Sequence, residues 1–334
     1  MHKTRSYVRF LVSVLFILQA FSLSGLTIKL ATLTPAGSVW DEALKNLGAE
    51  WTRISNGAIS FKIYSGGVAG DEGDMLRKIR IGQLDAAVLS GMGFAKMHPE
   101  LFILNLPFFY RTDEELLYVL DRMKGKFEGF ISDKGFNIVA WQLAGWIYFF
   151  SKDKVVYPQD LMTHKVSVTA DAPEISAIWK TMGFSIVPLS TIDLMSGLQS
   201  GMVNAFYSLP MMSAAYQWFG LAKNMCSIQL APLVGGLIIG DRAWNQVPDE
   251  LKPELIEAAD RILTPLYADT LRVDAEAIEV MRKYGLVVNE VPPAAMDEWR
   301  RLGEKGYGEI VGKTISVGIY NEVRGLLEQF RKGK

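Results

Sequence analysis

Residues 161–210 have the sequence LMTHKVSVTADAPEISAIWKTMGFSIVPLSTIDLMSGLQSGMVNAFYSLP, and this stretch decides the fold. Its apolar runs and its glycine and proline breakers predict five short elements: a strand over 165–169, a helix over 173–182, a strand over 185–189, a helix from 190 to 201 and a strand over 203–207. We expect Ser190 to cap the second helix, with Asp193 completing a capping box. This alternation predicts parallel strands joined by right-handed crossovers, and such sheets bind ligands beyond the carboxyl ends of their strands.

The preceding residues predict further units of the same kind. Strands are expected over 27–33, 59–63 and 84–89, with a helix after each of the first two. The glycine-rich run SGGVAG, residues 65–70, lacks both the GK[ST] ending and the GxGxxG spacing of phosphate-binding loops. It is therefore interpreted as a turn between a strand and a helix.

The middle and the end of the chain predict elements that connect two lobes. Two strands are expected over 136–141 and 146–150, and in the second Trp146 and Tyr148 lie on one side, facing either the core or a cleft. Residues 248–284 predict one long helix, kinked at Pro265. At a rise of about 1.5 Å per residue this helix would be roughly 50 Å long, so we expect it to cross both lobes as a strut. Arg331–Lys334 are expected to form a basic, frayed tail.

The composition suits a large two-lobed protein and excludes several kinds of site. The chain has 334 residues, of which 49% are hydrophobic, so it can bury large cores. Three histidines and one cysteine do not form a zinc motif, and they leave few candidates for a Ser-His-Asp triad. We therefore expect no metal, no other cofactor and no catalytic residue.

The first residues have the layout of a secretory signal peptide, which we assign to 1–26. Three basic residues precede the apolar run 11–21, and small residues follow it. A retained membrane anchor and a buried N-terminal helix are the alternatives. Residues 1–24 contain three of the 35 basic residues and none of the 36 acidic ones, so the remainder has 32 against 36, a net charge of −4. Such a protein has no basic footprint for nucleic acid, and we expect a periplasmic location.

Several phrases, in this order, resemble the solute-binding proteins of TRAP transporters, the tripartite ATP-independent periplasmic family of the DctP type. They are IGQLDAA (81–87), NLPFFY (105–110), MGFSIVPL (182–189), GLQSGMVNA (197–205) and WNQVPDELKPELIEAA (244–259). The resemblance implies a two-lobed α/β fold of the type II periplasmic binding proteins, in which each lobe is a mostly parallel sheet flanked by helices. It also implies transport without catalysis, with a small-molecule ligand and the membrane permease subunits of the transporter as partners.

Applied to this chain, the two-lobed scheme gives the following division. Lobe I is expected at 27–144 plus 228–262, lobe II at 145–227 plus 263–300, and a C-terminal helical segment at 301–334.

One position departs from the family pattern. Most members carry an arginine in the strand that corresponds to 165–169, where its guanidinium binds the carboxylate of an organic acid through two hydrogen bonds. The phrase LMTHKVSVT places Ser167 at that position, and the chain has no arginine between Arg122 and Arg242. A serine hydroxyl does not offset the cost of burying a carboxylate. We therefore predict a small ligand that is hydrophobic or uncharged.

The predicted ligand-binding residues come from both lobes. They are Ser38, Glu72, Ser90, Trp146, Tyr148, Ser167, Thr191, Phe206, Tyr207, Ser208, Leu209 and Met211. Ser208 takes the place of the family's ligand-facing asparagine, and the aromatic and aliphatic members provide an apolar surface.

Other functions stay open. One is a carrier that hands an apolar molecule to a tetratricopeptide-repeat protein in the periplasm, with exposed aromatics such as Trp218 or Trp244 as the contact. A second is a protein that holds an organic acid without the usual arginine, and a third is the binding protein of an ATP-dependent importer. An enzyme using Asp71, Glu72 or Asp193 as acid or base is less favoured, because the spacing does not bring two of these carboxylates together.

Overall fold

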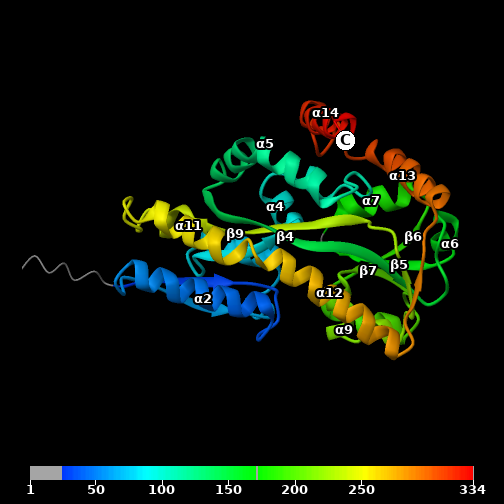
Figure 1. The fold of residues 1–334 in the computed structure, drawn as a ribbon, viewed down its shortest axis with the longest axis horizontal. Coiled ribbons are helices and arrows are strands. Elements are labelled where there is room, and N and C mark those ends of the chain that lie inside the picture. The colour runs from blue at the N-terminus through cyan, green and yellow to red at the C-terminus, as the bar shows by residue number, and fades with distance from the viewer. Residues whose placement is uncertain (1–24, 171, 334) are drawn as a thin grey trace, which may run out of the picture.

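The computed structural model describes residues 25–170 and 172–333, and in this part of the chain ten strands form one mixed sheet (Figure 1). The strands are β1 (Leu26–Ala31), β2 (Ile59–Tyr64), β3 (Ala86–Ser90), β4 (Phe136–Ser151), β5 (Lys165–Thr169), β6 (Ser185–Leu189), β7 (Ala205–Ser208), β8 (Asn224–Cys226), β9 (Ala231–Gly240) and β10 (Val287–Asn289). Their order is β2-β1-β3-β9-β4-β7-β5-β6, and β8 joins β4 to β10 beside this path. β1 pairs in parallel with β2 and β3, and β5 pairs in parallel with β6 and β7. Each lobe thus has its own parallel strands, as predicted.

Helices pack on both sides of this sheet (Figure 1). They are α2 (Val39–Ile54), α3 (Glu72–Arg80), α4 (Gly91–Met97), α5 (Asp113–Ser132), α6 (Pro158–Met162), α7 (Pro173–Thr181), α8 (Leu194–Gln199), α9 (Pro210–Ala215), α10 (Asp241–Trp244), α11 (Lys252–Leu263), α12 (Leu266–Lys283), α13 (Pro293–Tyr307) and α14 (Val317–Lys332), with short 3₁₀ helices η1 (Pro99–Asn105), η2 (Thr191–Asp193) and η3 (Trp218–Gly220). In α2 the apolar residues recur at helical spacing, so Leu44, Leu47 and Trp51 are all buried. The Trp51 Nε1–H donates to the Leu255 carbonyl on α11 at 3.0 Å, which joins the two helices in the core of lobe I.

The two strands predicted over 136–141 and 146–150 are one continuous strand, β4. It pairs with β9 along most of its length and then with β7 and β8. The pairing register with β9 shifts between Leu143 and Trp146, where Gly145 has a φ of +104°. A glycine adopts this backbone conformation without a Cβ clash, and the irregularity lets the strand bend without ending. β4 and β9 therefore carry the sheet from one lobe into the other.

The predicted strut is present as two helices divided at Pro265. α11 packs on α2, α12 packs on α9, and both contact β4 (Figure 1). Proline has no N–H to donate and its ring crowds the preceding turn, so the helix is interrupted at the predicted position.

The helix predicted from 190 to 201 is a 3₁₀ turn, η2, followed by α8. The Ser190 hydroxyl donates to the Asp193 carboxylate at 2.5 Å, and it makes no hydrogen bond to a backbone N–H. The predicted capping box is therefore wrong, because the two side chains bind each other.

The predicted frayed tail is also wrong for its first residues. α14 extends to Lys332, and the Arg331 guanidinium donates to the Glu115 carboxylate at 2.7 and 2.8 Å and to the Phe109 carbonyl at 3.0 Å. Glu115 is 3% exposed, so this ion pair holds the end of the helix against α5. Lys334 lies outside the described residues.

The ends of the predicted segments compare with the structure as follows. The signal peptide, 1–26, lies outside the described residues except for Gly25 and Leu26, and Leu26 begins β1. Within the described residues, no helix combines the length and the apolar character needed to cross a membrane. The boundary predicted at residue 300 falls inside α13, and the other lobe boundaries stay predictions.

Candidate ligand-binding site

A cavity of about 210 Å³ lies where the parallel strands of lobe II end. β5, β6 and β7 contribute residues at or next to their carboxyl ends, as expected for ligand sites in sheets of this type. The lining residues are Ile147, Ser167, Val168, Thr169, Leu189, Ser190, Thr191, Leu194, Phe206, Tyr207, Ser208, Leu209, Met212, Trp218 and Leu233. This cavity, called the cleft cavity below, is the candidate ligand site.

The side chains that line the cleft cavity are all uncharged. Of the 15 residues that line it, nine are apolar, six carry a hydroxyl group and none is charged. Ser167 is 8% exposed, and its hydroxyl makes no hydrogen bond to another described residue, so this group is free to bind a ligand. The Ser190 hydroxyl, which lines the cavity, donates to the Asp193 carboxylate, so the charged group next to the cavity is an acid. The cavity can hold an apolar body and a few hydroxyl or carbonyl groups, and its walls provide no cation for a carboxylate.

Six of the predicted residues line this cavity together. They are Ser167, Thr191, Phe206, Tyr207, Ser208 and Leu209. Met211 does not line it: its backbone N–H donates to Asp274 at 2.9 Å, and Met212 lines the cavity in its place. α9 begins at Pro210, so the alternation of the preceding strand does not continue to residue 211. The helical spacing after Pro210 could have identified Met212.

Trp146 and Tyr148 do not line the cleft cavity. The Trp146 Nε1–H donates to the Asp113 carboxylate at 2.5 Å, and Tyr148 lines a different cavity. Ile147, between them on β4, is the residue that lines the cleft cavity. Neighbouring residues of a strand point to opposite sides, so Ile147 faces this cavity and the two aromatic residues face away from it. A part of Trp146 and Tyr148 in ligand binding stays a prediction.

The predicted residues of lobe I, Ser38, Glu72 and Ser90, do not line this cavity, and each makes hydrogen bonds within its own lobe. The Glu72 carboxylate accepts the Ser90 backbone N–H at 2.5 Å and its hydroxyl at 2.9 Å, and Glu72 is 9% exposed. Ser38 caps α2 by accepting the Asp41 N–H at 3.2 Å. Their part in ligand binding stays a prediction.

An acidic residue of the strut, Asp274, lies close to residues at the edge of the cleft cavity. Asp274 on α12 accepts the N–H of Met211, and its carboxylate lies so close to Gly145 that a Cβ there would be 2.9 Å from Oδ2. The same Cβ would be 3.5 Å from Leu209, which lines the cavity. Burial raises the pKa of Asp274 to about 6, with the hydrogen bond from Met211 opposing.

The aromatic residues expected to be exposed are buried. Trp218 is 4% exposed and packs against Phe206, with ring centroids 5.7 Å apart. Trp244 is 8% exposed and packs against Trp51 at 6.2 Å. The prediction that they form a surface for a protein partner is therefore wrong, since each fills a hydrophobic core.

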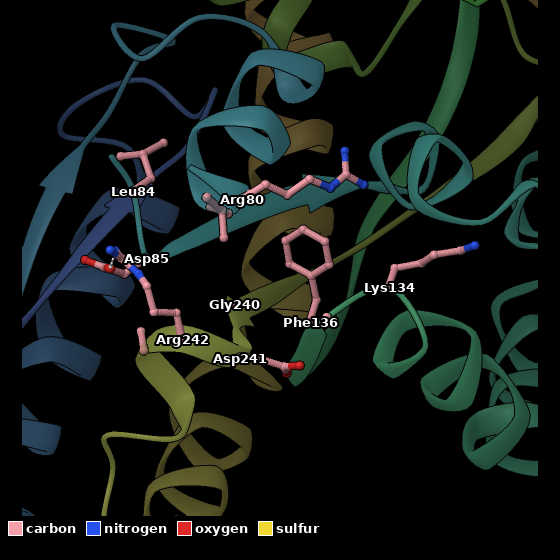
Figure 2. A pocket seen from close by; sticks show the side chains of 11 residues that line it. Arg80, Leu84, Asp85, Lys134, Phe136, Gly240, Asp241 and Arg242 are labelled. Carbon is pink, nitrogen blue, oxygen red and sulfur yellow. Dashed lines mark hydrogen bonds and ion pairs between the residues drawn. The ribbon is translucent and has the colours of Figure 1, made fainter. Parts of the chain in front are cut away.

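A second cavity of similar volume lies in lobe I, and both basic and acidic side chains line it (Figure 2). The Arg242 guanidinium turns towards Asp85 and donates to it at 2.9 Å, while Arg80 passes beside the Phe136 ring at 5.6 Å. The cavity lies where β3 and β4 begin, and not at the carboxyl ends of parallel strands, so it is a weaker candidate. Within residues 25–170 and 172–333, no group of three or more His, Cys, Asp or Glu side chains could hold a metal ion.

Fold and cavity together define a two-lobed α/β solute-binding protein. The chain belongs to the DctP family, the bacterial extracellular solute-binding proteins of family 7, whose model matches residues 30–314.

Solved structures of TRAP periplasmic solute-binding proteins have the same fold. One from Desulfovibrio salexigens, with bound orotic acid, is 15% identical with a TM-score of 0.83, covering 91% of this chain and 99% of that one. One from Sulfurospirillum deleyianum, with bound succinate, is 19% identical with a TM-score of 0.81, covering 90% and 98%. At this level of identity the likeness establishes the fold alone.

Curated relatives are similarly distant. The 2,3-diketo-L-gulonate-binding periplasmic protein of Escherichia coli is 25% identical over 274 residues, which is 81% of this chain and 77% of the relative. A solute-binding protein of Chromohalobacter salexigens is 22% identical over 227 residues, 66% of each chain. For several other curated relatives, this chain spans about half to two thirds of their length.

Proposed function

We propose that this protein is the periplasmic solute-binding subunit of a TRAP-type transporter and that its cleft cavity binds a small ligand that is uncharged and largely apolar. The observation that carries the ligand class is the lining of the cavity, in which hydroxyl groups and apolar side chains occur without any charged residue. Ser167 stands at the centre of this argument, because the resemblance to the family places an arginine there. A buried carboxylate would meet no cation from these walls, and its desolvation would be uncompensated.

The partner in this proposal is a membrane permease, to which the closed protein would deliver its ligand. We propose that the signal peptide at 1–26 directs export. We also propose that the two lobes consist of 27–144 plus 228–262 and of 145–227 plus 263–300. Handover of an apolar ligand to a tetratricopeptide-repeat protein has less support, since Trp218 and Trp244 are buried.

A second candidate keeps the transporter and changes the ligand. Related structures hold succinate, orotic acid and D-glucuronate, all of which carry a carboxyl group. An organic acid held in the cleft of this chain would need hydroxyl groups such as those of Ser167 and Ser208 in place of a guanidinium, and such binding would be weak.

The two candidates are separated by a competition experiment. The uncharged fluorophore N-phenyl-1-naphthylamine is titrated into purified protein, and succinate and D-glucuronate are then added as competitors. We expect saturable fluorophore binding that neither acid displaces, together with an uncharged compound released by denaturation and detected by mass spectrometry. Tight binding of either acid, with no saturable binding of the fluorophore, would overturn the proposed ligand class.

A further inference from the structure

A third cavity of about 210 Å³, distinct from the cleft cavity and from the cavity of Figure 2, lies between the segment that precedes α5, the segment between β8 and β9, and α13. Its lining residues are Phe108, Tyr110, Arg111, Tyr148, Ser227, Ile228, Gln229, Met296 and Arg300. It shares no lining residue with the cleft cavity. An adjoining cavity of about 330 Å³ also contains Phe108, Arg111 and Arg300, so these three residues stand between two hollows. We call the first of these hollows the arginine cavity.

The lining of the arginine cavity includes two guanidinium groups and no carboxylate. Arg111 makes no side-chain hydrogen bond or ion pair with the described residues. Desolvation lowers the pKa of Arg111, and the positive charges of Arg331 and Arg300 lower it further. The carboxylates of Glu115 and Asp297 oppose this effect only in part. Arg331 is paired with Glu115 and Arg300 with Asp297, whereas the Arg111 guanidinium has no carboxylate partner among the described residues, so a bound anion could pair with it.

Arg300 is also poorly satisfied by the protein. Its guanidinium meets the Met296 sulfur at 2.9 Å and the Asp297 carboxylate at 3.3 Å. A thioether is a weak acceptor, and a guanidinium can donate two parallel hydrogen bonds to a planar oxyanion. N–H groups of the Arg300 guanidinium therefore stay available to donate hydrogen bonds to a ligand in the cavity.

Tyr110, which also lines the cavity, has a hydroxyl group without a hydrogen-bond partner among the described residues. Tyr110 is 2% exposed. A buried polar group without a partner costs about 1–3 kcal/mol, so an acceptor supplied by a ligand would recover part of that cost. The remaining walls include Phe108, Ile228 and Met296, which suit an apolar body.

We propose that the arginine cavity is a second ligand site, which binds the carboxylate of a small organic acid with an aromatic or aliphatic body. Arg111 and Arg300 hold the carboxylate, and the Tyr110 hydroxyl donates a further hydrogen bond. The apolar walls favour such an acid over an inorganic oxyanion. This inference is independent of the ligand proposed for the cleft, because the two cavities have no residue in common.

Benzoate is a suitable probe, titrated by calorimetry into the wild-type protein and into the variants Arg111→Gln, Arg300→Gln and Tyr110→Phe. Losing one charge-assisted hydrogen bond should weaken benzoate binding by about tenfold to a hundredfold in each arginine variant. Tyr110→Phe should weaken it by a smaller factor while leaving the thermal midpoint unchanged or higher, which a merely structural role would not produce. Arg272→Gln is the control, since Arg272 is exposed on α12 and pairs with Glu276.

Two further measurements decide the location and the ligand class. Benzoate should not displace N-phenyl-1-naphthylamine from the cleft, and inorganic phosphate should bind more weakly than benzoate. Absence of benzoate binding, binding unchanged in both arginine variants, or displacement of the fluorophore would each overturn the second site. Phosphate binding as tight as that of benzoate would overturn its assignment to organic acids. If the fluorophore itself does not bind, the proposal for the cleft fails while the benzoate titrations still test this one.

Discussion

Asp274, on α12, the second helix of the strut, accepts a hydrogen bond from the backbone N–H of Met211 at 2.9 Å. Met211 follows the strand end that forms one wall of the cleft cavity, and Gly145 of β4 lies against the same carboxylate. One buried acid therefore links the strut, strand β4 and the segment that follows the wall of the candidate ligand site. Changes at Asp274 should affect both stability and ligand binding.

The stability of the protein should depend on pH through Asp274. Burial raises its pKa in the folded state from 3.8 to about 6, so the folded protein favours the protonated form. Protonated Asp274 therefore stabilises the folded state. Its contribution to the free energy of unfolding is fully present below about pH 4 and is lost as the pH rises through 6, a change of about 3 kcal/mol or less. Asp274→Asn keeps the acceptor for Met211 and removes the charge. The difference in thermal midpoint between this variant and wild type should therefore grow in favour of the variant from pH 4 to 7, and a constant difference would contradict the prediction.

Gly145→Ala should destabilise the protein strongly. The residue has a φ of +104°, and its new Cβ would lie 2.9 Å from the Asp274 carboxylate, so strain and steric overlap add. We expect a loss of about 3 kcal/mol in the free energy of unfolding, measured by urea denaturation. Gly125→Ala on α5 is the control, because its Cβ meets no atom within 4 Å and alanine favours the helix. It should stabilise by about 0.5–1 kcal/mol, and similar losses in both variants would refute the explanation.

Ser167→Arg should change the ligand profile of the cleft. A guanidinium among uncharged walls would weaken binding of N-phenyl-1-naphthylamine by about tenfold or more and create measurable binding of succinate. Ser185→Arg, at the exposed start of β6, is the matched control and should change neither titration. Because the arginine could disturb the buried strand, Ser167→Val is tested beside it and should preserve fluorophore binding. An unchanged profile in a folded Ser167→Arg protein would show that residue 167 does not contact the ligand.

Arg331→Met should loosen α14 from α5. The change leaves the Glu115 carboxylate buried at 3% exposure without its cation, and Arg331 itself is 28% exposed. We expect a loss of about 2–3 kcal/mol in the free energy of unfolding, with faster amide hydrogen exchange in α14. Arg324→Met removes an exposed ion pair on the same helix and should cost about 0.5 kcal/mol or less. Equal costs for the two variants would mean that the pair does not anchor the helix.

Local sequence predicted most of the elements, but it did not predict which partner a polar side chain binds. Breakers such as Gly183 and Pro265 gave correct boundaries because their backbone preferences act within a few residues. The capping box predicted for Ser190 and Asp193 is wrong, because the two side chains bind each other. The frayed tail predicted from Arg331 is wrong for its first residues, because the partner of Arg331, Glu115, lies 216 positions away.

The sequence by itself indicated the alternating α/β order, because this order depends on periodicity and turn residues. Its phrases also carried the resemblance that indicated the class of protein, and this resemblance implied the departure at Ser167. Only the tertiary structure decided which side chains share a cavity. The register shift of β4 near Gly145 directs Ile147, and not Trp146, into the cleft cavity. The start of α9 at Pro210 does the same for Met212, and not Met211. The direction of a side chain depends on pairing between strands and helices distant in sequence, and a shift of one residue reverses it.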